Sequence, residues 1–105
     1  MKQIQAFVHR HRAADLMHAL EAEGFHRISV LESKGLPPAG RVRDAEYSVQ
    51  LAESVVPEAQ ILLVCADEAV PAAIAVLQRS MHASRRDSGW LCVVPVEQVV
   101  ALGDA

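Results

Sequence analysis

The sequence predicts an α+β fold in which the elements follow in the order strand, helix, strand, strand, helix, strand. Two observations support this prediction. Short stretches of alternating or continuous apolar residues recur along the 105 residues. Two further stretches, with apolar residues at helical spacing, lie between them. This order is that of the split βαβ, or ferredoxin-like, arrangement (βαββαβ), whose helices cover one face of the sheet.

The first half of the chain supplies two strands and a helix. Residues Lys2–His9 alternate imperfectly between apolar and polar types, which predicts a strand. A helix follows, with Leu16 and Leu20 on its apolar face, and Gly24 is expected to end it. The run His26–Gly35 alternates again and predicts the second strand.

The middle of the chain departs from this pattern. From Leu36 to about Val56 no apolar period is sustained. About 20 irregular residues exceed an ordinary connector, whose median length is about 4–6 residues. A loop of this length is expected to be functional or mobile. Its part Ala45–Leu51 could extend a flanking strand.

The second half repeats the strand and helix. The apolar run Ile61–Cys65 predicts a buried strand, and Asp67 is expected to cap the next helix. A polar turn over Ala83–Gly89 and a strand over Trp90–Val94 follow, and Val96–Leu102 predicts a short turn or a further strand. The buried face of the second helix is predicted to comprise Val70, Ile74, Leu77 and Met81.

The sheet leaves one face without helices. The alternation of Ile28 and Val30 indicates that this second face is not wholly polar. A homo-oligomer is the simplest way to cover it.

Composition narrows the classes of function. At 105 residues, 11.4 kDa and 51% hydrophobic content, residues 1–105 are expected to form one folded domain. A net charge of −3 and 4% aromatic residues argue against nucleic acid or an anionic membrane as a partner. No apolar run approaches a membrane span and no secretory signal is recognisable, so a cytoplasmic protein is expected. Cys65 and Cys92 lie in apolar runs and are expected to be reduced core thiols.

No pattern of enzyme chemistry is recognisable. The chain has no glycine-rich phosphate loop before a helix, no nucleophile elbow and no CxxC pair. Ser80, His82 and Asp87 lie close in sequence, but surface polar residues at a helix end explain them better than a catalytic triad. We therefore expect a protein that is not an enzyme.

Two groups of polar residues leave alternatives open. His9 and His11 would point to the same side of a strand and could share a metal ion, or they could be solvated imidazoles in a basic strand end. Arg85 and Arg86 could bind a phosphate or carboxylate through bidentate donors, or form a solvated charged turn.

Over nearly the whole chain, to about Leu102, the residues resemble the PII signal-transduction family (nitrogen regulatory protein P-II). The run ISVLESKG resembles the family's second-strand pattern, with Ser29, Glu32, Lys34 and Gly35 at its characteristic positions. The close DSGWLCVVPVEQVV resembles the family's last turn and strand, followed by Pro-Val-Glu.

The resemblance implies a homotrimer that binds an adenine nucleotide in the clefts between subunits. A protruding T-loop, here about residues 36–56, would change shape with the bound effector and dock onto a partner. A B-loop, about residues 83–89, and the C-terminal segment would close the cleft. The resemblance places Ser29 and Val64 beside the adenine, Gly35 at the T-loop base and Gly89 in the B-loop.

Several positions depart from the family pattern. Trp90 stands where the family has a B-loop lysine, and Ala101 and Gly103 stand where it has two arginines. Each lost cation removes a charge-assisted hydrogen bond of about 1.5–3 kcal/mol. We therefore expect AMP or ADP to bind better than Mg-ATP, without a need for 2-oxoglutarate. Other departures from the family pattern are Ala39, Leu51 and Asp87.

The expected function is that of a PII-like sensor with no obligatory cofactor. Its effector would be AMP or ADP, with bicarbonate as a further candidate, and Arg85 and Arg86 could assist phosphate binding. Its T-loop would act on a partner, expected to be a membrane transporter or a regulatory protein, or would bind an anion. Two alternatives are a metal-linked PII-like or CutA-like trimer that uses His9 and His11, and a structural trimer with a vestigial cleft. The candidate T-loop contacts are Lys34, Arg41, Arg43 and Tyr47.

Overall fold

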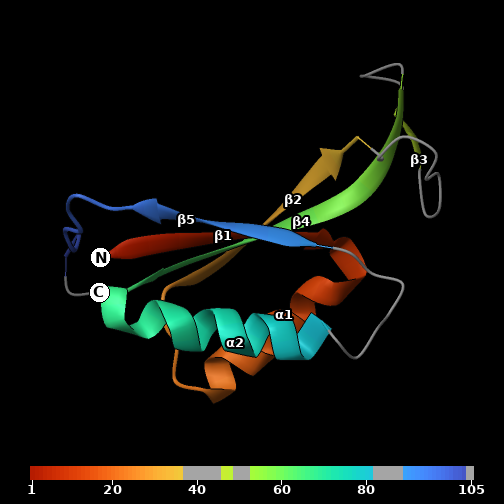
Figure 1. Ribbon diagram of the computed structural model, residues 1–105. Coiled ribbons are helices and arrows are strands. Elements are labelled where there is room, and N and C mark those ends of the chain that lie inside the picture. Colours follow the sequence, from red (N-terminus) through yellow and green to blue (C-terminus); the bar gives the residue numbers. More distant parts are fainter. Residues whose placement is uncertain (37–45, 49–52, 82–88, 104–105) are drawn as a thin grey trace.

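The computed structural model describes residues 1–36, 46–48, 53–81 and 89–103 (Figure 1). The elements are β1 (Lys2–His9), the 3-10 turn η1 (Arg10–Arg12), α1 (Ala13–Ala22), β2 (Ile28–Gly35), β3 (Glu46–Ser48), β4 (Glu53–Cys65), the 3-10 turn η2 (Asp67–Ala69), α2 (Val70–Met81) and β5 (Trp90–Pro95). Their order confirms the predicted ferredoxin-like fold, with the short β3 added.

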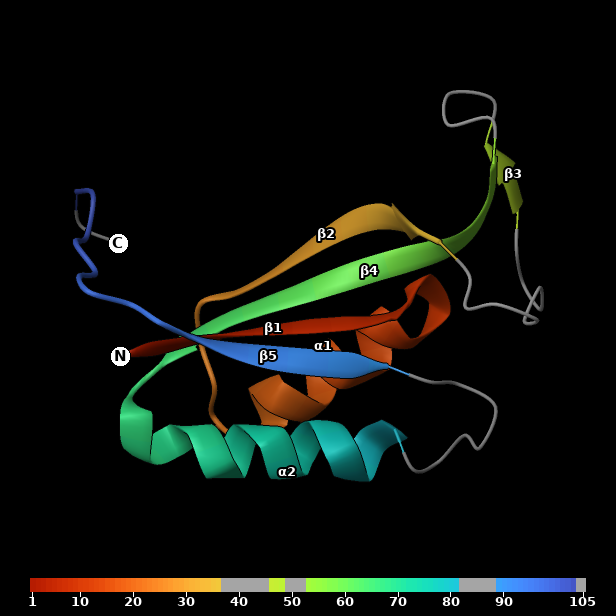
Figure 2. The same cartoon turned by 45° about the horizontal axis from the view of Figure 1, so that its top comes forward.

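The main sheet has the strand order β2-β4-β1-β5, and all its neighbouring strands are antiparallel. Both helices lie on one face of this sheet, as Figure 1 shows. The first part of β4 extends beyond the other strands and pairs there with β3 (Figure 2). The edges of the main sheet are therefore β2 on one side and β5 on the other.

The core lies between the sheet and the two helices. Ile4, Ala6 and Val8 alternate along β1 and are buried against Leu16 and Leu20 of α1. Burying a large aliphatic side chain contributes about 1.5–3 kcal/mol. Gly24 takes a left-handed φ of 88° after α1, which confirms the predicted helix end.

The open face of the sheet is mixed in character. The strand register places Ile28 and Val30 opposite Leu63 and Ile61, on the helix side. The alternation of Ile28 and Val30 was therefore a wrong reason for expecting apolar residues on the open face. That face nevertheless carries apolar side chains among polar ones. Two adjacent rows of residues cross it: Ser29, Leu62, Gln5 and Cys92, then Leu31, Gln60, Phe7 and Trp90.

Strand β4 is longer than predicted. The sequence indicated Ile61–Cys65 as a continuous buried run, whereas β4 begins at Glu53. From Val55 to Cys65 its residues alternate between buried and half-buried, because one set faces the helices and the other the open face. The C-terminal segment 96–103 forms no helix or strand, so of the two alternatives predicted for Val96–Leu102, a short turn or a further strand, the strand is excluded.

For the second helix, the predicted cap is wrong and the predicted buried face is incomplete. Asp67 lies in η2, and its carboxylate binds the Met1 amino group at 2.8 Å and Lys2 Nζ at 3.4 Å instead of capping α2. The hydrogen bond from the Met1 ammonium, assisted by Lys2, lowers the pKa of Asp67. The side chains that α2 buries are Ala73, Val76 and Leu77, with Val70, Ile74 and Met81 partly buried beside them.

None of the described helices is long and apolar enough to cross a membrane.

Candidate functional site

Ser29 and Val64, expected beside the adenine, both lie on the open face toward one end of the sheet. Ser29 is exposed on the edge strand β2, opposite Leu62 of β4. Val64 is half-buried near the end of β4, opposite Gln3 of β1. Because both belong to adjacent strands and the same face, they can contribute to one surface.

Gly35 lies at the other end of β2, roughly 20 Å along the strand from Ser29. A Cβ at Gly35 would lie 2.7 Å from Oε2 of Glu58, whose Oε1 accepts a hydrogen bond of 3.0 Å from Ser33 Oγ. Glycine therefore lets the Glu58 carboxylate lie against the backbone at the end of β2. Sequence reasoning missed Glu58, because only the register of β2 and β4 brings it here.

Gly89 precedes β5, the opposite edge of the sheet. A Cβ there would lie 2.9 Å from the backbone oxygen of Phe7 and 3.1 Å from Val8 Cγ1. Residue 89 must therefore be small for the chain to return from α2 into β5. The next residue, Trp90, stacks on Phe7 with ring centroids 4.0 Å apart and remains 61% exposed. A neutral aromatic ring thus occupies the position where the resemblance implies a lysine.

An open groove of about 640 Å³ lies beside Val64. The C-terminal segment, including Val96 and Glu97, forms part of its wall. Arg27 also lines the groove and adopts a left-handed φ of 60°, which is uncommon for a residue with a Cβ. Its guanidinium makes no ion pair or hydrogen bond with any other described residue. No sequence signal marked Arg27, since nothing in its residue type predicts this backbone conformation.

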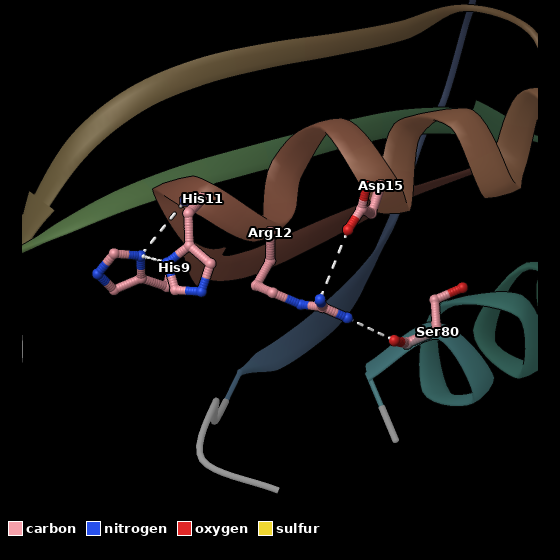
Figure 3. A network of polar contacts seen from close by, with 5 residues as sticks. All are labelled: His9, His11, Arg12, Asp15 and Ser80. Atoms are coloured by element: carbon pink, nitrogen blue, oxygen red, sulfur yellow. Dashed lines mark hydrogen bonds and ion pairs between the residues drawn. The ribbon is translucent and has the colours of Figure 1, made fainter. Parts of the chain in front are cut away.

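Arg12 connects the first turn to the end of the second helix. Its Nη2 donates a 2.6 Å hydrogen bond to the backbone oxygen of Ser80, and its Nη1 lies 3.5 Å from Asp15 Oδ2 (Figure 3). The Arg12 side chain is only 13% exposed. A buried cation at the C-terminus of a helix satisfies a terminal carbonyl and the helix dipole. This contact fixes the end of α2 immediately before residues 82–88.

The sequence suggested that His9 and His11 lie in one strand, and the structure shows that they do not. His9 ends β1 and His11 lies in η1, yet their imidazoles still meet, with Nδ1 atoms 2.5 Å apart. Within the part of the chain that the structure describes, no cluster of three or more His, Cys, Asp or Glu side chains could hold a metal ion.

The two cysteines differ in environment. Cys65 is buried in the core, and burial raises the pKa of its thiol. Cys92 lies on the open face, where its Sγ is 3.4 Å from Gln5 Oε1. The prediction of a core thiol is therefore confirmed for Cys65 and wrong for Cys92.

Several predicted site residues lie outside the described residues: Ala39, Arg41, Arg43, Leu51, His82, Arg85, Arg86 and Asp87. Tyr47 lies in β3, where it is paired with Ser54. Lys34 is near the end of β2, opposite Pro57 of β4. Ala101 is exposed in the segment after β5, and Gly103 has a left-handed φ of 76°.

Comparisons with known proteins give one consistent result. The family model described as Nitrogen regulatory protein P-II matches residues 1–104. The chain is 33% identical over 109 residues to the nitrogen regulatory protein P-II of Azospirillum brasilense, an alignment that covers 97% of this chain and 91% of that protein. It is 30% identical to the proteins of the same name from Mesorhizobium japonicum and Cereibacter sphaeroides, with the same coverage.

Proposed function

Because the chain belongs to the nitrogen regulatory protein P-II family, we propose that it binds an adenine nucleotide in a cleft between two copies of the chain. The effector is AMP or ADP in preference to Mg-ATP, and its binding is transmitted to a partner protein through residues 36–56. One observation carries this proposal: the positions that resemble the family's nucleotide site are divided between the two sides of the sheet, with Ser29, Gly35 and Val64 on β2 and the adjacent β4, and Gly89 at the β5 edge.

Ser29 and Gly35 lie on the edge strand β2, whereas Gly89 precedes β5 at the opposite edge. Three strand spacings separate these edges, roughly 14–15 Å. Ser29 and Gly35 are also about 20 Å apart along β2. A single chain therefore cannot bring all these positions around one base and its phosphates. A second copy that places its edge beside the first would complete the set.

The character of the open face supports a homotrimer. Its apolar side chains include Leu31, which is 50% exposed, and the stacked pair of Phe7 and Trp90. In a monomer these groups would face water, whereas association of open faces around a common axis buries them.

The preference for AMP or ADP follows from the missing cations. Trp90 is held against Phe7, and neither Ala101 nor Gly103 carries a charge. A γ-phosphate would thus lose charge-assisted hydrogen bonds of about 1.5–3 kcal/mol each. Arg85 and Arg86 are candidates for contacts with the remaining phosphates. Bicarbonate near the T-loop base remains a second candidate effector, and a membrane transporter is the partner we favour.

Isothermal calorimetry with AMP, ADP, Mg-ATP and bicarbonate tests the proposal. We expect ADP or AMP to bind at least tenfold more tightly than Mg-ATP, with no requirement for 2-oxoglutarate. Tighter binding of Mg-ATP with strict dependence on 2-oxoglutarate would refute the proposed preference. The double change Arg85→Ala and Arg86→Ala should weaken nucleotide binding by tenfold or more if these residues contact phosphate, a loss of about 1.4 kcal/mol.

A further inference from the structure

The end of β1 brings two imidazoles into direct contact. The Nδ1 atoms of His9 and His11 lie 2.5 Å apart, and the ring centroids are 4.2 Å apart at an interplanar angle of 53° (Figure 3). Nucleotide binding as proposed above does not use this pair. We propose that His9 and His11 form a binding site for a divalent transition-metal cation, with Nδ1 of each ring as a ligand.

The local backbone explains why the rings meet. β1 ends at His9, and η1 turns the chain at once, so that the backbone N–H of His11 donates to His9 Nδ1 at 3.3 Å. This bond makes His9 Nδ1 an acceptor and therefore places the proton of the neutral ring on Nε2. That single lone pair serves both the backbone N–H and the facing His11 Nδ1, so a bound metal must also displace the backbone hydrogen bond. A metal cation can take the place of the proton that the two Nδ1 atoms share.

The distance between the two nitrogens favours one class of metal. Metal–nitrogen bonds to imidazole are about 2.0–2.1 Å long. At that length, ligands at a right angle lie about 2.9 Å apart and tetrahedral ligands about 3.3–3.4 Å apart. The Nδ1 atoms are closer together than either spacing, so both rings must rotate and separate to receive a metal, and less movement is needed for a right angle than for a tetrahedron. Octahedral or square-planar cations such as Ni²⁺ and Cu²⁺ are therefore favoured over Zn²⁺.

The charges around the pair permit a cation. Arg10 and Arg12 flank His11 in sequence, but each has a carboxylate partner. Arg10 Nε lies 3.7 Å from Glu32 Oε1, and Arg12 Nη1 lies 3.5 Å from Asp15 Oδ2. In Figure 3 the Arg12 side chain extends toward Asp15, away from the two imidazoles. The two guanidinium charges are thus largely offset.

Among the described residues, no third side chain is placed beside the pair to complete the coordination of a metal, so we expect water or small anions to contribute ligands. The described residues hold no cluster of three or more candidate ligands. The contact between the imidazoles is exposed, which leaves space for such ligands. Two imidazole ligands alone give moderate affinity, so we expect a reversible site that is occupied according to the free metal concentration.

Calorimetric titration of the full, untagged chain with Ni²⁺ tests the site. We expect one Ni²⁺ per chain, weaker binding of Zn²⁺ and no binding of Mg²⁺ at the same concentration. His9→Ala and His11→Ala should each weaken Ni²⁺ binding at least tenfold, or about 1.4 kcal/mol. His18→Ala is the matched control, because His18 is also exposed but pairs with Glu21 on α1; it should leave Ni²⁺ binding unchanged.

A second measurement needs no variant. Paramagnetic Ni²⁺ should broaden the imidazole resonances of His9 and His11 in the unmodified protein before those of His18 and His26. Binding that survives both His9→Ala and His11→Ala, or that is lost in Cys92→Ala instead, would overturn the site. Tighter binding of Zn²⁺ than of Ni²⁺ would overturn the geometric assignment. None of these outcomes depends on whether a nucleotide binds.

Discussion

Arg27 provides a test of backbone strain with a matched control. Its φ of 60° costs a residue with a Cβ roughly 1–2 kcal/mol, a cost that glycine does not bear. Arg27→Gly also increases the freedom of the unfolded chain, which offsets about 0.4–1 kcal/mol of this gain. The net result expected for Arg27→Gly is a stabilisation of about 0.5–1 kcal/mol. Arg27→Ala removes the same guanidinium but keeps the Cβ, so its stability should change little.

Urea unfolding followed by circular dichroism and by Trp90 fluorescence measures both variants. Protein concentration must be held constant, because association of copies would add to the measured stability. For a chain of about this size, the expected gain raises the Tm by roughly 2–8 °C. Equal stability of the glycine and alanine variants, or a less stable glycine variant, would refute the argument from strain.

Three further predictions follow from other contacts. Arg12→Ala should destabilise the protein by about 1.5–3 kcal/mol in urea unfolding, because it removes a charge-assisted hydrogen bond to Ser80 O; a neutral result would show that the end of α2 does not depend on it. Gly89→Ala should cost about 1–3 kcal/mol by the same measurement, because its Cβ would lie 2.9 Å from the Phe7 backbone oxygen; wild-type stability would contradict the close packing there. The pKa of Asp67 is lowered from 3.8, chiefly by the hydrogen bond from the Met1 ammonium. The ionised Asp67 carboxylate therefore stabilises the fold above pH 3.8, and this stabilisation is lost as pH falls through the lower pKa of the folded state. The stability difference between wild type and Asp67→Asn should therefore be constant from pH 7 to 5 and shrink below 3.8, and a difference that grows on acidification would refute this linkage.

The local pattern of apolar residues is sufficient to predict the bounds of an element when one face of that element is buried along its whole length. The bounds of β1, Lys2–His9, were predicted to the residue because Ile4, Ala6 and Val8 alternate with residues of the open face. The first half of β4 was missed, because Pro57 and Glu58 interrupt the apolar pattern. That half is extended because it pairs with the end of β2 and with β3, partners distant in sequence.

The sequence singled out glycines and lost cations as features of the candidate site, and a role of these positions in nucleotide binding stays a prediction. Gly35 and Gly89 were found through the family resemblance, but the reasons for them, the Glu58 carboxylate and the Phe7 backbone, are tertiary contacts. The reach of Arg12 to Ser80, 68 residues away, and the left-handed conformation of Arg27 leave no signal in the local sequence.

The most direct measurement of the central claim, that two chains share one nucleotide site, is complementation between two variants. Ser29→Glu places a negative charge on the β2 edge, and Trp90→Glu places one at the β5 edge; both positions are exposed in the single chain, so both variants are expected to fold. Because Trp90 also belongs to the open face, sedimentation must show that each variant still assembles. Each variant alone should lose ADP binding in calorimetry. When the two are co-expressed with different tags and isolated together, some interfaces pair two unaltered edges, and a fraction of the ADP sites should return. Failure of the mixed assembly to bind ADP, while the unaltered protein binds it, would contradict a site formed between two chains.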